Sequence, residues 1–117
     1  MKSLFSNRAL VFLAASLGMV MIGMAPGAAA RAATPATHTV AIEGATFATA
    51  DLTVNAGDAV VWVNKDPYPH TATSKAAGFD SREIAPEKSW SYTAKTKGDF
   101  AYVCAIHPSM TGTLHVK

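Results

Sequence analysis

Four side chains, three near the C-terminal end and one in an upstream turn, have the types and spacing of a metal site. Cys104, His107 and Met110 follow one another at intervals of three residues in Cys-Ala-Ile-His-Pro-Ser-Met, and His70 stands upstream after Tyr68-Pro. One thiolate, two imidazoles and one thioether are the ligand set of a mononuclear blue-copper site, which transfers electrons. The sequence therefore predicts one type 1 copper ion per chain, held by these four residues.

The same residue types explain why such a site can carry electrons. Thiolate and thioether sulfur suit Cu(I), whereas imidazole nitrogen suits both Cu(I) and Cu(II). Because a mixed set serves both oxidation states to a similar degree, few atoms have to move when an electron arrives or leaves. Cys104, His107 and Met110 lie on one tight loop, so His70 has to come from another strand and tie that loop to the domain.

Other interpretations of these residues are weaker. Cys104 taken alone indicates a small buried hydrophobic side chain, since a free Cys is usually inert. His70 taken alone indicates a turn residue whose ring bonds to the backbone. The spacing Cys-x-x-His-Pro-x-Met lacks the second Cys or His pair of a zinc finger, and it lacks the second Cys of a binuclear copper loop. The combination favours a mononuclear copper site.

The remaining histidines and the aromatic residues are assigned to structural positions. We expect His38 at the ragged start of the domain. We expect His115 to face solvent, because it alternates with Leu114 and Val116, which should face the core. The aromatic side chains expected in the core are Phe47, Trp62, Phe79, Trp90, Phe100 and Tyr102.

The first thirty residues have the layout of a secretory signal peptide. Lys2 and Arg8 form a basic start, residues 9–25 carry no charge, and residues 28–30 offer small residues for cleavage. The apolar run is short for a membrane span of about 20 residues, so an uncleaved anchor is the weaker alternative. We therefore expect an exported, periplasmic protein that is cleaved near Ala30 and keeps no membrane anchor.

The composition after residue 30 limits the remaining possibilities. Residues 31–37 are small and polar and are expected to form a flexible tail, which leaves one domain over residues 38–117. Eight basic and eight acidic residues remain, so the formal net charge falls from +2 to 0 and indicates no nucleic-acid partner. Cys104 is the only Cys, so an internal disulfide is excluded, and an unpaired thiol in an oxidising compartment favours metal binding. We expect a monomer.

Short segments rich in β-branched and aromatic residues predict strands, because Gly, Pro, Asn and Asp separate them. The polar segment 74–88 is expected to hold at most one turn of helix. This pattern is typical of an all-β Greek-key β-sandwich or barrel of about seven or eight short strands. The expected strands are residues 39–43, 51–54, 59–64, 71–73, 89–93, 100–104 and 112–116.

With these residues in place, the chain resembles the cupredoxins, and specifically the amicyanin, pseudoazurin and plastocyanin group of small type 1 copper proteins. The matching stretches are residues 47–64, 69–71 and 98–112, which cover most of the chain after residue 30. The short Cys-x-x-His-Pro-x-Met loop is most similar to that of amicyanin. The resemblance implies ligation by Nδ1 of both His70 and His107, by the Cys104 thiolate and by the Met110 thioether.

Two positions bear on the redox potential of the copper, and the first of them departs from the pattern that the resemblance implies. The family usually has Asn after the first ligand histidine, bonded to the ligand loop, whereas this chain has Thr71. We expect its hydroxyl to bridge to the loop instead. Pro108 has no N–H, so one possible hydrogen bond near the thiolate is absent. Fewer donors should leave the sulfur more electron-rich and shift the potential.

The function expected from these features is a soluble, exported one-electron carrier with a Cu(II)/Cu(I) site. Its partners would be a redox donor and acceptor, such as a dehydrogenase or a c-type cytochrome, that dock near His107. The alternative is a periplasmic copper-binding carrier protein, but one Met and no His cluster after residue 30 count against it. An enzyme with Cys104 as nucleophile is not expected, because no oxyanion hole or substrate pocket can be identified.

Overall fold

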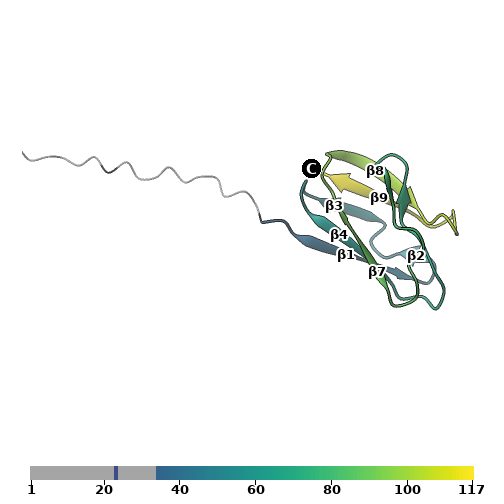
Figure 1. Ribbon diagram of the computed structural model, residues 1–117. Coiled ribbons are helices and arrows are strands. Elements are labelled where there is room, and N and C mark those ends of the chain that lie inside the picture. Colours follow the sequence, from purple (N-terminus) through teal and green to yellow (C-terminus); the bar gives the residue numbers. More distant parts are fainter. Residues whose placement is uncertain (1–22, 24–33) are drawn as a thin grey trace, which may run out of the picture. The chain divides into compact units, whose positions relative to one another are not determined.

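Strands joined by turns and loops are the only regular secondary structure in the described part of the chain (Figure 1). The computed structural model describes residue 23 and residues 34–117. The expected signal peptide thus lies outside the described residues, except for Gly23. No segment of the described residues forms a helix with the length and apolarity needed to cross a membrane. The all-β sandwich predicted from the sequence is confirmed.

Nine strands occur in the described residues, two more than the sequence pattern marked out. The two additional strands, β2 and β6, have two residues each and are too short to produce a recognisable alternation. β1 begins at Thr37, so the predicted tail is wrong at its last residue, which forms part of the strand. The strands are β1 (Thr37–Glu43), β2 (Thr46–Phe47), β3 (Asp51–Val54), β4 (Ala59–Asn64), β5 (Thr73–Ser74), β6 (Phe79–Asp80), β7 (Ser89–Thr93), β8 (Gly98–Val103) and β9 (Thr111–Val116).

The strands form two sheets that face each other. One sheet has the order β2-β1-β4-β7, and the other has the order β3-β9-β8-β5-β6. β1 pairs in parallel with β4, and β3 pairs in parallel with β9. The full-length antiparallel pairing of β8 with β9 brings the end of β8 and the start of β9 together. The loop between these two ends carries Cys104, His107 and Met110.

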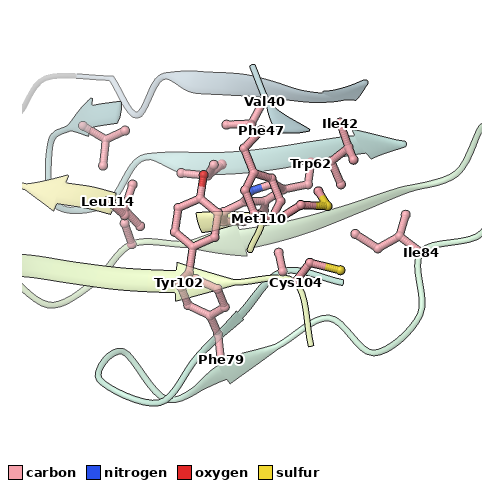
Figure 2. Close-up of a cluster of buried hydrophobic side chains, with 14 of the residues drawn as sticks. Val40, Ile42, Phe47, Trp62, Phe79, Ile84, Tyr102, Cys104, Met110 and Leu114 are labelled. Carbon is pink, nitrogen blue, oxygen red and sulfur yellow. The ribbon is translucent and has the colours of Figure 1, made fainter. Parts of the chain in front are cut away.

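The core lies between the sheets and is filled by alternate residues of the strands. In β4 the side chains of Val60, Trp62 and Asn64 are buried while their neighbours are only partly so. Tyr102 packs edge-on against Trp62 with ring centroids 5.4 Å apart. Figure 2 shows the aromatic cluster with Cys104, Met110 and Ile84 toward one end of it. The core therefore continues directly into the predicted metal site.

The aromatic residues occupy the positions expected of them, with two only partly buried. Trp90 and Phe100 are packed against the core without being fully enclosed. β7, which carries Trp90, is an edge strand, so only one strand of the sheet, β4, lies beside it. The four fully buried aromatic residues are Phe47, Trp62, Phe79 and Tyr102.

Candidate metal centre

A buried asparagine shapes the turn that carries His70. Asn64 ends β4, and its side-chain amide donates to the carbonyl oxygens of Tyr68 at 2.8 Å and Ile84 at 2.9 Å. Its side-chain oxygen accepts the N–H of Asp66 at 2.9 Å. Because all of these bonds lie in or beside the segment between β4 and His70, Asn64 fixes the path by which the chain reaches that ligand.

His70 is held by both its backbone and its ring. Its backbone pairs with Ile84 in an isolated bridge, with N···O distances of 3.2 and 2.7 Å. Its side chain is fully buried, and Nε2 lies 2.7 Å from Oδ2 of Asp66. Its other ring nitrogen, Nδ1, lies 3.8 Å from the sulfur of Cys104. The ring therefore directs Nδ1 toward the predicted site.

The second element is the loop between β8 and β9. The Cys104 N–H donates to the Met110 carbonyl at 3.0 Å, and the Met110 N–H donates to the His107 carbonyl at 2.9 Å. These bonds close the loop on itself, so the side chains of three candidate ligands project from one compact stretch of backbone. Cys104 and Met110 are buried, and Figure 2 shows their sulfur atoms at the same end of the core.

Three of the four predicted ligands form one cluster. The candidate ligand atoms of His70, Cys104 and His107 lie within 4.8 Å of one another. The two imidazole rings have centroids 5.2 Å apart. Nδ1 of His107 is buried and has no hydrogen-bond partner. A buried ring nitrogen without a hydrogen-bond partner is costly in a purely structural role, so this arrangement fits a metal ion better than a simple polar core.

The surroundings of Cys104 favour ionisation of its thiol. Burial raises the pKa of this group, but N–H donors, that of Thr71 foremost, and the ring of His70 outweigh burial and lower it from 9.0 to about 6. The Thr71 N–H lies 3.3 Å from the sulfur. Because a thiolate rather than a thiol binds metal, the site favours the ligand form of Cys104 at neutral pH.

The hydroxyl of Thr71 bridges to the ligand loop, as expected from the sequence. Its Oγ1 accepts the N–H of Ala105 at 2.7 Å. The same hydroxyl lies 3.0 Å from that of Thr73 in β5. Thr71 therefore joins the segment after His70 to the loop after Cys104, as the Asn expected from the resemblance would have done.

Sequence reasoning missed Asp66. This residue is 6% exposed, and its carboxylate bonds to His70 and to the backbone N–H groups of Gly44 and Ala45. Burial raises the pKa of Asp66, but those N–H groups and His70 outweigh burial and lower it. The only signal in the sequence is a carboxylate four residues before a ligand histidine, which many surface turns share.

The other two histidines lie outside the cluster. His38 bonds to the buried carboxylate of Asp58 at 2.9 Å, and His115 bonds to the exposed carboxylate of Asp99 at 2.7 Å. His115 remains partly exposed, with 37% of its side chain accessible, which agrees with the orientation predicted from the alternation in β9. Both histidines therefore have carboxylate partners of their own.

Two exposed hydrophobic residues lie near the half-buried His107 in space or in sequence. Tyr68 and Ile106 are the large hydrophobic residues with the most exposure among the described residues, at 42% and 44%. The ring of Tyr68 lies 5.1 Å from that of His70 and 6.0 Å from that of His107, between centroids. His107 thus lies between the buried cluster and exposed apolar side chains.

Comparison with known proteins agrees with this geometry. A family model described as "Cupredoxin-like domain" matches residues 12–116. Amicyanin from Paracoccus versutus is 30% identical over 83 residues, which cover 67% of this chain and 63% of that protein. Amicyanin from Paracoccus denitrificans is 32% identical over 76 residues, which cover 61% of this chain and 58% of that protein. The chain thus aligns with less than two thirds of the length of these relatives.

Solved structures extend the likeness to the fold. The Cu(I) form of an amicyanin variant superimposes with a TM-score of 0.65 at 29% identity, covering 69% of this chain and 82% of that one. The copper cofactor predicted from the sequence is confirmed by these relatives, and the cluster of His70, Cys104 and His107 is a possible site for it. Because the family model spans most of the sequence, the chain belongs to the cupredoxin-like family.

Proposed function

We propose that this protein is a one-electron carrier whose copper is held by Nδ1 of His70, Sγ of Cys104, Nδ1 of His107 and Sδ of Met110. The observation that carries the proposal is the convergence of two imidazoles and one thiol within 4.8 Å, with His107 Nδ1 buried and unpaired. Copper bound there would supply a Cu(II)/Cu(I) couple. The chain would supply a rigid set of donors that serves both states.

Rigidity is what the surrounding residues contribute. His70 and Cys104 are fully buried, Asp66 bonds to the first and the Thr71 N–H to the second. The loop that carries Met110 is closed by two backbone hydrogen bonds. Because His70, Cys104 and the loop backbone are held in place before an electron arrives, the transfer should require little rearrangement of the protein.

Partners would dock on the surface around His107. Tyr68 and Ile106 give it an apolar rim, and a small apolar contact suits the weak, transient encounters of redox proteins. The formal net charge after residue 30 is zero, so the rate of association should fall only weakly with salt. We propose a donor and an acceptor protein that use this surface in turn. An Ile106→Asp substitution should slow both reactions, and equal rates in the variant would rule out this docking surface.

We also propose that the protein is exported to the periplasm. The signal-peptide layout of residues 1–30 predicts delivery to the periplasm, where reduced cytosolic thiols do not compete for the metal. Edman sequencing or intact mass of the protein recovered from the periplasm tests this directly. A mature N-terminus near Arg31 is expected, whereas an intact Met1 in the membrane fraction would favour the uncleaved anchor.

One experiment separates electron transfer from copper transport. Voltammetry of the copper-loaded protein is run with and without an excess of a Cu(I) chelator. A carrier of electrons should give a reversible one-electron wave that persists over many cycles with the chelator present, because the buried ligands retain the metal. Loss of the wave as Cu(I) passes to the chelator would contradict the proposal and favour copper transport.

A further inference from the structure

A series of hydrogen bonds leads from the ligand loop to an exposed carboxylate on β6. The Ala105 N–H donates to Oγ1 of Thr71 at 2.7 Å. The hydroxyl oxygens of Thr71 and Thr73 lie 3.0 Å apart, and the Thr73 hydroxyl donates to Oδ1 of Asp80 at 3.1 Å. Thr71 is buried, whereas Asp80 is exposed. These four residues form a hydroxyl relay that runs from beside Cys104 to the protein surface.

The β5–β6 hairpin places Asp80 at the end of this relay. Thr73 in β5 and Asp80 in β6 are direct partners across the two strands. Ala72, between the two threonines, donates its N–H to Oγ of Ser81 at 2.8 Å, and its carbonyl accepts the Ser81 N–H at 3.0 Å. Oδ1 of Asp80 also accepts the Arg82 N–H at 2.9 Å. Asp80 is therefore bonded both to its own turn and to the facing strand.

We propose that Asp80 is a positioning residue that sets the direction of the hydroxyl relay and so strengthens the acceptor that holds the ligand loop. It lies outside the cluster of candidate ligands, and it acts on the loop through Thr73 and Thr71. The inference rests on the proposed function, because it adds a residue to the surroundings of the same site. Its test uses the metal-free protein and does not depend on electron transfer.

The direction of the relay follows from which groups can donate. A carboxylate only accepts hydrogen bonds, so the single hydroxyl proton of Thr73 has to lie toward Asp80. That proton is then not available to Thr71, so the Thr71 hydroxyl has to donate to Thr73. The Thr71 oxygen keeps its lone pairs for the Ala105 N–H. Every bond of the relay thus points from the ligand loop toward Asp80.

This common direction should strengthen the bond at the ligand loop. Hydrogen bonds in series polarise one another, and bonds to an ionised group are stronger than bonds between neutral groups. The carboxylate should therefore make the Thr71 oxygen a better acceptor for Ala105. Without Asp80, the Thr73 hydroxyl would be free to donate to Thr71, whose lone pairs would then be shared between Thr73 and Ala105. A surface charge on β6 is thus coupled to the loop that carries Cys104.

The measurement is hydrogen exchange and the proton chemical shift of the Ala105 amide, by ¹H–¹⁵N NMR of the metal-free protein. Asp80→Ala removes the last acceptor of the relay. The Ala105 amide should then exchange about 2- to 5-fold faster, the upper limit being the net worth of one hydrogen bond, and its resonance should move upfield. Asp80→Asn should restore most of the protection, because the Asn oxygen can still accept from Thr73 and Arg82. An Asn variant that exchanges as fast as the Ala variant would overturn the role of Asp80 as an acceptor.

Thr73→Val separates the relay from the charge. It removes the middle hydroxyl and leaves the carboxylate of Asp80 in place, so it should accelerate Ala105 exchange as much as Asp80→Ala does. Because both substitutions act through the same series of bonds, the double variant should exchange little faster than either single variant. Two effects that multiply in full would show that Thr73 and Asp80 act on Ala105 independently, and would overturn the proposal.

Asp99→Ala is the matched control. Asp99 is also an exposed carboxylate of the same sheet that accepts a hydrogen bond from a side chain of the neighbouring strand, His115. It takes no part in the relay, so its removal should leave the exchange rate of Ala105 unchanged. Rates are compared with those of β4 amides, in the other sheet, so that a change in global stability is not counted as a change in the relay.

Neutron diffraction from crystals of the deuterated wild type tests the direction of the relay without any variant. We expect the hydroxyl deuteron of Thr71 between the two threonine oxygens and that of Thr73 toward Asp80. A Thr73 deuteron directed at Thr71 would overturn the proposal, as would wild-type exchange of Ala105 in Asp80→Ala. The expected relay together with an absent redox wave would instead count against the proposed electron transfer alone.

Discussion

The hydroxyl of Thr71 accepts the backbone N–H of Ala105 at 2.7 Å, which joins the residue after one candidate ligand to the residue after another. The N–H of the same Thr71 lies 3.3 Å from the Cys104 sulfur. One residue thus contacts the thiolate and fixes the loop that carries it. Since Thr replaces the Asn that the family resemblance leads one to expect, its contribution can be measured by substitution.

Thr71→Val keeps the shape of the side chain and removes the acceptor for Ala105. We expect the free energy of unfolding to fall by about 1 kcal/mol, and the Ala105 amide to lose its protection in hydrogen-exchange NMR. Thr71→Ser keeps a hydroxyl and should retain that protection. An Ala105 amide that stays protected in the Val variant would show that the hydroxyl does not hold the loop.

The ionisation of Cys104 should be visible in the ultraviolet absorbance of its thiolate, which requires no reagent to reach this fully buried side chain. In the metal-free protein the absorbance should rise through about pH 6 and then level off, since the pKa of the thiol is lowered from 9.0 to about 6. Cys104→Ser is the control and should show no such rise. A rise only above about pH 8 would contradict this lowered pKa.

Gly112 should tolerate no side chain, because Tyr102 lies directly across the β8–β9 ladder from it. A Cβ built on Gly112 would lie 2.3 Å from Cζ of Tyr102. Gly112→Ala should therefore cost about 3 kcal/mol and lower Tm by more than about 10 °C. In a Tyr102→Leu background the same substitution should cost much less, and an equal cost in both backgrounds would exclude this clash as the cause.

Asp58 should make stability depend on pH in the acid range. Bonds from His38, Ala36 and Asn55 lower its pKa from 3.8 to about 2. A carboxyl with a lowered pKa in the folded state stabilises the protein above its unfolded pKa. Stability should thus fall as pH drops from about 4 toward 2.

Urea unfolding between pH 2 and pH 5 checks this dependence. Asp58→Asn should be less stable than the wild type at pH 5 and should lose less stability on acidification. Some dependence should remain, because the pKa of Asp66 is also lowered. Identical acid slopes for the variant and the wild type would contradict the role of Asp58.

Much of this structure follows from short-range sequence patterns. The alternation in 59–64 and 89–93 located β4 and β7 to the residue, because one face of each is covered by the core. β2 and β6 were not predicted, since a strand of two residues has no period to detect. The same limit applies to β5, which begins at Thr73, where the predicted strand ended.

The candidate site, like the strands, could be predicted from the sequence only in part. Cys104, His107 and Met110 could be grouped from spacing alone, and His70 from its residue type. Asp66 could not, because its role depends on the turn at Gly44, which only the folded chain brings against it. Contacts between segments distant in sequence thus account for what sequence reasoning missed.

The cluster of His70, Cys104 and His107, with Met110, is expected to bind one copper ion as a type 1 site. The most direct measurement is the visible absorption spectrum of the purified protein titrated with Cu(II), with Cys104→Ser as the control. We predict an intense blue band that saturates at one copper per chain, is bleached reversibly by ascorbate and is absent from the control. Copper bound without that band, or a control that remains blue, would contradict the assignment of Cys104 and its partners as a type 1 site.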